Sequence, residues 1–363
     1  MSAARTVVDL DDSAGLAEAD REGLLRAAAM AGAQVRATAA AIDEGALDSL
    51  SGLVHPRSVV WVGGRGAAEA AGAMLSAALS GSAGEPLVLA AESPPWIGPL
   101  DVVVVAGDDP ADPVLVNAAA TAVRRGAPVV VAAPYAGPLR DATAGRAAVL
   151  EPRVWVPDDF GLCRYLAAGL ATLAAVDAAV PADLAALADE LDAEALRNGI
   201  AREVFTNPAK ALADRMSGRS VVLAGDCAAT RALARHGAAV LLRVAGQPVA
   251  PVGLADVLVA MRSGGLATPV ADTVDALFHD EQLDPPLPRR HRVIALSLTA
   301  ERPMLAARVA GLDDVDLLSP EDTGEAFTGE DAATPLPARV EEQVAVLALR
   351  LEMAAVYLRL AAG

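Results

Sequence analysis

A strand that runs through a glycine turn into a helix occurs twice in this sequence, and this repeat most limits how the chain can fold. The first copy, Val59 to Gly72, begins Val-Val-Trp-Val-Gly-Gly-Arg-Gly and continues into an alanine-rich helix. The second copy, Ser220 to Arg231, has the same layout of apolar residues, glycine and helix start. Such a turn leaves backbone N–H groups at a helix N-terminus, where they can bind an anion. The repeat predicts two α/β units built on one plan.

Further strands and helices alternate around both copies. The segment Asp101 to Ala106 contains four consecutive valines, which is typical of a central parallel strand buried on both faces. Other strands are predicted at 87–91, 128–133, 148–156, 292–298 and 315–318, and helices at 20–41, 67–80, 138–144, 160–180, 182–196, 233–242, 254–262, 304–310 and 340–360. The alternation predicts an α/β fold with a doubly wound, flavodoxin-like parallel sheet in each unit.

The expected domain organisation follows from these elements. Residues 1–20 form an acidic N-terminal arm, 21–180 the first unit, 181–218 a helical linker, and 219–363 the second unit with its closing helix. With 363 residues, of which 54% are hydrophobic, the chain can bury a large core.

Composition excludes several classes of partner. The formal net charge is −18, from 47 acidic and 29 basic residues, so general binding to nucleic acid or to an anionic membrane is not expected. The apolar segment Tyr165 to Val180 contains Asp177 and is shorter than the roughly 18–20 residues that a membrane span needs. The segment Met1 to Asp20 has no apolar leader, and the two cysteines imply no disulfide framework. A cytoplasmic protein is therefore expected.

The glycines of the first turn allow two interpretations. As a dinucleotide-binding fingerprint, Gly63, Gly64 and Gly66 lack the third glycine at its usual place, where Glu69 stands, although Glu92 ends the next strand and could contact a ribose. The simpler interpretation is that the glycines only form the turn.

The histidines give a weak signal by themselves. His55, His236, His279 and His291 have no metal-ligand spacing, so no metal site is expected. His279 precedes two carboxylates, Asp280 and Glu281, but such a group is more often a solvated loop than a catalytic one.

Several short segments match, in order along the chain, one family of enzymes. These segments are Gly63–Gly66, Arg125-Gly126-Ala127, Phe160-Gly161-Leu162-Cys163-Arg164, Asn207-Pro208-Ala209-Lys210, Phe278-His279-Asp280-Glu281 and Val356-Tyr357-Leu358. Together they resemble the bifunctional phosphoglucose/phosphomannose isomerases, which are built from two sugar isomerase (SIS) subdomains.

The resemblance implies a function and a set of site residues. It implies aldose–ketose isomerisation of a hexose 6-phosphate (glucose, mannose or fructose 6-phosphate) by a homodimer that needs no cofactor. His279 would assist ring opening, Arg164 would steady the enediolate, and Glu281 is a candidate base. The residues implied in substrate or phosphate binding are Gly63, Gly64, Arg65, Gly66, Gly107 and Lys210.

Two departures from the family keep a second hypothesis open. Where the family holds phosphate with a Ser/Thr-rich loop, this chain has Ala-Gly-Asp-Asp-Pro-Ala-Asp-Pro at 106–113, and Arg65 can compensate only in part. The segment that carries the family's glutamate base, Met261 to Gly265, has no carboxylate, which leaves Glu281 or Asp256 for that role. The alternative is therefore a non-catalytic SIS protein that binds a sugar phosphate or partners an active isomerase.

Overall fold

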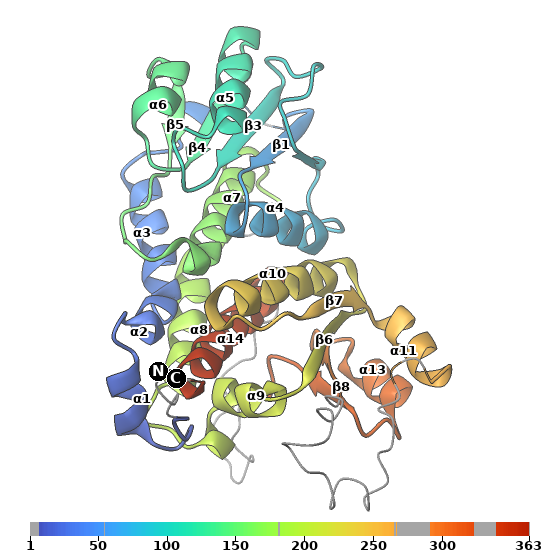
Figure 1. The fold of residues 1–363 in the computed structure, drawn as a ribbon. Coiled ribbons are helices and arrows are strands. Elements are labelled where there is room, and N and C mark those ends of the chain that lie inside the picture. The colour runs from blue at the N-terminus through green and yellow to red at the C-terminus, as the bar shows by residue number, and fades with distance from the viewer. Residues whose placement is uncertain are drawn as a thin grey trace, which may run out of the picture.

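Two parallel β-sheets define the molecule (Figure 1). The computed structural model describes residues 7–53, 55–180, 182–264, 266, 291–322 and 339–362. The first sheet has the order β2-β1-β3-β4-β5, with strands β1 (Ser58–Gly63), β2 (Leu87–Ala90), β3 (Asp101–Ala106), β4 (Val129–Ala132) and β5 (Ala147–Val149). The second has the order β7-β6-β8-β9, with β6 (Ser220–Gly225), β7 (Ala250–Gly253), β8 (His291–Leu296) and β9 (Val315–Leu318). The predicted fold class, α/β with two doubly wound parallel sheets, is confirmed.

The helices lie on both faces of each sheet. The first part of the chain contains α1 (Ser13–Ala19), α2 (Leu24–Ala28), α3 (Ala31–Asp43), α4 (Ala67–Ala78), α5 (Pro113–Arg125), α6 (Gly137–Thr143), α7 (Leu162–Val176) and α8 (Leu184–Arg197). The second part contains α9 (Pro208–Met216), α10 (Ala228–Ala245), α11 (Leu254–Arg262), α13 (Arg302–Val309) and α14 (Val340–Ala361). In addition, 3-10 turns occur at Asp48–Leu50, Asp158–Phe160 and Val204–Thr206.

The valine-rich strands are buried on both faces because helices cover both faces. Along β1, Val59 and Trp61 pack into the central core, while Val60 and Val62 pack into a separate cluster formed with α5 and α6. This alternation follows from the two-residue period of a strand. In the second sheet, Leu223 of β6 likewise belongs to the central core, and its neighbours belong to a cluster formed with α11 and α13.

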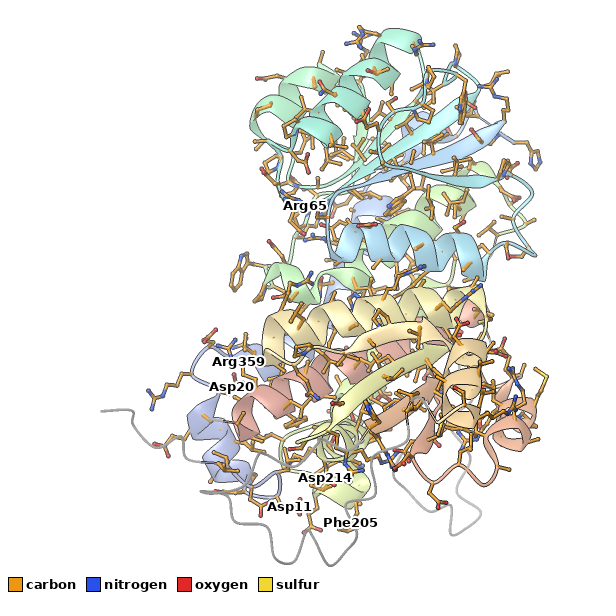
Figure 2. All side chains as sticks on the ribbon, turned by 45° about the vertical axis from the view of Figure 1, so that its right-hand side comes forward. Asp11, Asp20, Arg65, Phe205, Asp214 and Arg359 are labelled. Carbon is orange, nitrogen blue, oxygen red and sulfur yellow. The ribbon has the colours of Figure 1, made fainter. Side chains whose placement is uncertain are left out.

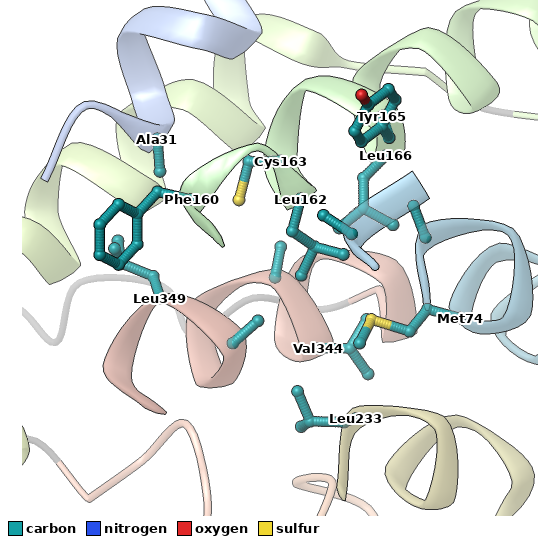
Figure 3. Packing of buried hydrophobic residues seen from close by; sticks show 14 of the residues in the cluster. Ala31, Met74, Phe160, Leu162, Cys163, Tyr165, Leu166, Leu233, Val344 and Leu349 are labelled. Atoms are coloured by element: carbon teal, nitrogen blue, oxygen red, sulfur yellow. The ribbon is translucent and has the colours of Figure 1, made fainter. Parts of the chain in front are cut away.

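The two sheets share one central core. Helix α10 of the second unit packs against α4 of the first unit and against α14. Figure 3 shows this contact, where Met74 of α4 and Leu233 of α10 meet Val344 of α14 below Leu162 of α7. Because α14 is buried along almost its whole length, it joins both units into a single hydrophobic core.

The predicted duplication is visible in the strand register. β1 and β6 are the strands that carry the two glycine turns, and each ends at the glycine, Gly63 or Gly225. Gly63 lies beside Ala106 of β3, and Gly225 lies beside Leu296 of β8. An added Cβ at Gly225 would approach the backbone nitrogen of Arg231 to 2.4 Å, so the strand and its helix can touch only through a glycine there.

Three local features differ from the sequence-based expectations. Strand β7 was not predicted; it contains Pro251, which a sheet accepts here because β7 is an edge strand. The predicted helix at 20–41 is divided into α2 and α3, and α2 begins after Gly23, which has a positive φ of 67°. The acidic arm contains α1, and the Val8 amide donates a hydrogen bond to the Ala361 carbonyl at 3.2 Å, which brings the two ends of the described chain together.

Candidate functional site

The first glycine turn projects an arginine from the end of the first sheet. The Gly64 amide donates to the Ala106 carbonyl at 2.6 Å, which ties the turn to β3. Gly66 precedes α4 with a φ of 75°, a backbone conformation that favours glycine. Arg65 between them is exposed (Figure 2), and it forms no ion pair within the described residues. The turn therefore presents an uncompensated guanidinium beside the N-terminus of α4.

A cavity of about 860 Å³ lies beside this turn, between the two units. Helix α4 and the ends of β1 and β2 form one wall, and α10 forms the other. Helix α10 contributes Arg235, His236 and Arg243, whose spacing places them on one face of the helix. The contact between α4 and α10 therefore brings side chains from both units to one site.

Three arginines give the cavity its positive charge. Arg65 comes from the first unit, and Arg235 and Arg243 come from the second. Arg235 is exposed and forms no ion pair in the described part of the chain, whereas Arg243 pairs with Asp159. The acidic lining residues are Glu69 and Asp112, and the Asp112 carboxylate accepts a hydrogen bond from the Val114 amide at the start of α5. The free guanidinium groups can bind an anion in a protein that carries a large negative net charge.

A smaller hollow of about 400 Å³ beside the same turn is lined by more carboxylates, although Arg65 and Arg243 also line it. Its acidic lining residues are Asp108, Asp109, Asp112, Asp158 and Asp159. Burial raises the pKa of Asp158, and the nearby charges of Asp108 and Asp159 raise it further. The loop at 106–113, which the resemblance assigns to phosphate binding, is therefore acidic in space as well as in sequence, and Gly64 and Gly107 line the same hollow.

The predicted substrate arginine, Arg164, is paired within the protein. Its Nη2 donates to Asp108 Oδ1 and to the Tyr165 hydroxyl, each at 2.6 Å, and the hydroxyl donates to the same Asp108 oxygen at 2.5 Å. Burial raises the pKa of Tyr165, so this hydroxyl stays protonated as a donor. Arg164 Nε is buried without a partner among the described residues. Asp108 thus neutralises the arginine that the resemblance assigns to an enediolate.

The remaining predicted residues are dispersed. Gly107 lines the acidic hollow, beside the turn that carries Gly63 and Gly64. Lys210 lies elsewhere, in the first turn of α9, where its Nζ donates to the carbonyls of Ile200 at 2.9 Å and Arg202 at 2.8 Å. His279 and Glu281 lie outside the described residues. The site assignments that the resemblance implies for them stay predictions.

Sequence reasoning missed the α10 side of the cavity. His236 and Glu352 form a buried pair there, with His236 Nε2 and Glu352 Oε1 2.9 Å apart. The i, i+8 spacing of Arg235 and Arg243 was the available signal, since it places both on one helix face behind the second glycine turn. The spacing of the two arginines can be related to a cavity only when α10 is known to face α4.

One group of possible metal ligands comes together among the described residues. His55, Glu85 and Asp177 have ligand atoms within 4.8 Å of one another. His55 precedes β1, Glu85 precedes β2 and Asp177 follows α7, so the group lies near the N-terminal ends of these strands, whereas the cavity lies at their C-terminal ends. His55 Nδ1 is 2.6 Å from Glu85 Oε1, and Asp177 accepts hydrogen bonds from the Gly84 and Ala179 amides. These contacts give the three side chains polar partners within the protein.

Comparison with known proteins identifies solved structures that share the fold of this chain. No protein-family profile matches the sequence, and no curated protein matches it. Solved structures do. Tagatose-6-phosphate ketose/aldose isomerase from Escherichia coli has a TM-score of 0.59 and 14% identity, covering 98% of this chain and 95% of that one. The C-terminal domain of glucosamine-fructose-6-phosphate aminotransferase from Francisella tularensis has a TM-score of 0.58 and 11% identity, covering 94% and 96%. A hypothetical protein from Thermus thermophilus has a TM-score of 0.61 and 12% identity, covering 96% and 88%.

These likenesses extend over almost the whole chain and define the fold. The chain has the two-subdomain SIS fold, with both parallel-sheet units present. The bifunctional phosphoglucose/phosphomannose isomerase family, which the sequence resembles, is a finer assignment than the fold supports. In the part of the chain that the structure describes, none of the helices has the length and apolar character to span a membrane.

Proposed function

We propose that this protein binds a sugar phosphate in the cavity between α4 and α10. The observation that carries the proposal is the convergence of Arg65, Arg235 and Arg243 on the cavity, next to the N-terminus of α4. Guanidinium groups and helix N-terminal amides are the groups that proteins use to bind phosphate. The aldose–ketose isomerase among the solved structures of this fold carries a sugar phosphate in its name, which supports the same ligand class.

The electrostatics favour this cavity over the acidic hollow. Unit charges of like sign about 4 Å apart repel by about 4 kcal/mol at an effective dielectric constant of 20. The hollow contains Asp108, Asp109 and Asp159 near the point where a phosphate would lie, so a dianion there is strongly disfavoured. In the cavity, Arg65 and Arg235 are free to pair with it. We therefore place the phosphate on the α10 side of the glycine turn.

Calorimetric titration of the purified protein tests the binding site. The ligands are glucose 6-phosphate, mannose 6-phosphate and fructose 6-phosphate, with inorganic phosphate as a comparison. Arg65→Gln and Arg235→Gln should each weaken binding about 10- to 100-fold, because a hydrogen bond to a charged group contributes about 1.5–3 kcal/mol. Arg231→Gln is the matched control, since Arg231 is also an exposed arginine on α10 but lies outside the cavity lining. Equal losses in all three variants, or no binding by the unaltered protein, would contradict the proposal.

A second candidate function is aldose–ketose isomerisation of a hexose 6-phosphate. The resemblance to the bifunctional isomerases supports it, with His279 assisting ring opening and Glu281 near it; the homodimer and the cytoplasmic location belong to the same proposal. The pairing of Arg164 with Asp108 favours the alternative, a non-catalytic SIS protein that binds the sugar phosphate or partners an active isomerase.

An interconversion assay separates these two functions. The three hexose 6-phosphates are incubated with the protein, and the products are followed with time. Turnover above that of a His279→Ala variant supports the isomerase. Binding without turnover supports the non-catalytic alternative.

A further inference from the structure

We infer that His236 and Glu352 form the proton-transfer pair of the cavity, which moves a proton between C2 and C1 of a bound aldose phosphate. This inference rests on the proposed binding of a sugar phosphate between α4 and α10. It assigns the chemistry to residues of α10 and α14, apart from the His279 segment to which the resemblance points.

The first argument is position. His236 lines the cavity from the same face of α10 as Arg235 and Arg243, so a sugar whose phosphate pairs with the arginines extends along this face. Gly63 and Gly64 form the opposite wall. A hexose phosphate fits within about 860 Å³, a size typical of small-molecule sites. The imidazole therefore borders the volume that the ligand would occupy.

The second argument is orientation of the ring. His236 Nε2 lies 2.9 Å from Glu352 Oε1, and both side chains are only 1% exposed. A carboxylate accepts hydrogen bonds, so Glu352 keeps the proton on Nε2 and leaves the lone pair on Nδ1. Nδ1 makes no hydrogen bond within the described residues, and it is free to act as a base. A carboxylate that orients a histidine and stabilises its charged form is a recurrent catalytic arrangement.

Opposing effects act on the carboxyl group of Glu352. Burial raises the pKa of Glu352, and its hydrogen bond with His236 opposes that shift. The pair of Asp159 and Arg243 lies near enough to influence Glu352, which connects the dyad to the arginine side of the cavity. A proton gained at Nδ1 therefore creates an imidazolium directly beside a buried carboxylate, where the opposite charges attract strongly.

The proposed step is balanced without an oxidant, a reductant or a cofactor. His236 Nδ1 removes the proton from C2, the C2–H electron pair forms a C1=C2 double bond, and the C1 carbonyl π pair moves to O1. The resulting enediolate charge lies beside the imidazolium formed on His236, and the attraction between the opposite charges stabilises it. The proton on O2 then passes to O1, a C2=O2 carbonyl forms, and the imidazolium returns its proton to C1. The net result is an aldose converted to its ketose. His236 is the catalytic residue, and Glu352 is a positioning residue.

Solvent exchange at carbon detects this step even if net turnover is slow. The protein is incubated with glucose 6-phosphate or fructose 6-phosphate in D₂O, and deuterium at C2 and C1 is measured by NMR. We expect exchange with the unaltered protein. His236→Gln and Glu352→Gln should each lower its rate by about 100-fold or more, the usual contribution of general acid–base catalysis. Calorimetry on the same samples should give dissociation constants within about threefold of the unaltered protein.

Control variants separate a catalytic pair from a purely structural bridge between α10 and α14. His291→Gln changes a partly buried histidine on β8 and should leave exchange unchanged. His236→Asn serves as a second variant if His236→Gln fails to fold, as judged by circular dichroism. Absence of binding overturns the proposed function and this inference together. Binding without exchange, or exchange that persists in folded His236 variants, overturns this inference alone.

Discussion

Removing Glu194 from the central core should cost about 3–5 kcal/mol of unfolding free energy, the usual result of leaving a buried charge without its partner. Glu194 of α8 and Arg350 of α14 both have fully buried side chains. Arg350 Nε and Nη2 donate to the two carboxylate oxygens at 2.7 and 3.1 Å. Glu194→Ala leaves the guanidinium buried with the carbonyls of Ser319 and Pro320 as its remaining partners. Because these carbonyls are retained, we expect the lower end of that range.

The reverse deletion should cost less. In Arg350→Met, the Glu194 carboxylate keeps hydrogen bonds from Arg197 and Asn198, and Arg197 is partly exposed, so the charge is not isolated. The double variant, with Glu194→Ala added to Arg350→Met, should lose less stability than the sum of the two single variants, because neither charge of the pair remains.

Urea denaturation followed by circular dichroism measures these differences. Glu203→Ala is the control, because Glu203 is exposed and its replacement should change the unfolding free energy by less than about 0.5 kcal/mol. A Glu194→Ala variant that unfolds at the same urea concentration as Glu203→Ala would refute the reasoning. The result also bears on the cavity, because α14 holds Glu352 as well as Arg350.

Three further predictions concern single positions. Gly225→Ala should lower the free energy of unfolding by about 1–3 kcal/mol, because its Cβ would meet the Arg231 backbone. Gly52→Ala is the control and should not destabilise the protein, because the space around Gly52 is open. The urea midpoints of the two variants measure the difference. Burial alone would raise the pKa of Asp101, but hydrogen bonds, among them one from Arg57, outweigh burial and lower this pKa. The ionised carboxylate therefore stabilises the folded protein at neutral pH, and this stabilisation should be lost as the pH falls below about 4. Asp101→Asn should be less stable than the unaltered protein at pH 7 and should lose less stability on acidification. Lys210→Met should lower stability by about 2 kcal/mol through unsatisfied carbonyls, yet retain glucose 6-phosphate binding in calorimetry. A loss of binding at unchanged stability would instead support Lys210 as a substrate contact.

Much of the fold could be predicted from local sequence patterns. The four valines of β3 and the apolar residues before each glycine turn indicated strands buried on both faces, and the helices between them indicated parallel connections. Strand β7 was not found because Pro251 and a length of four residues give no strand pattern; only its place at the sheet edge makes the proline acceptable. Local periodicity therefore gave the class of fold, while the edges of the sheets depended on neighbours.

The candidate site was less accessible to sequence reasoning. The glycine turn and Arg65 could be recognised because they are contiguous, and the acidic loop at 106–113 could be recognised for the same reason. The pairing of Asp108 with Arg164 joins segments of the chain that nothing local relates. The resemblance directed attention to His279, whereas the described structure brings His236 to the cavity.

The sequence by itself determined that the chain forms two α/β units with a glycine turn that carries Arg65, because strand and helix periods, glycine positions and charge are properties of contiguous residues. Only the tertiary structure decided which charges meet. The packing of α4 against α10 places Arg65, Arg235 and Arg243 around one cavity, and the insertion of α14 places Glu352 against His236. These contacts form because apolar faces of helices distant in sequence are buried against one another. The same packing brings polar residues on those helices into contact with each other.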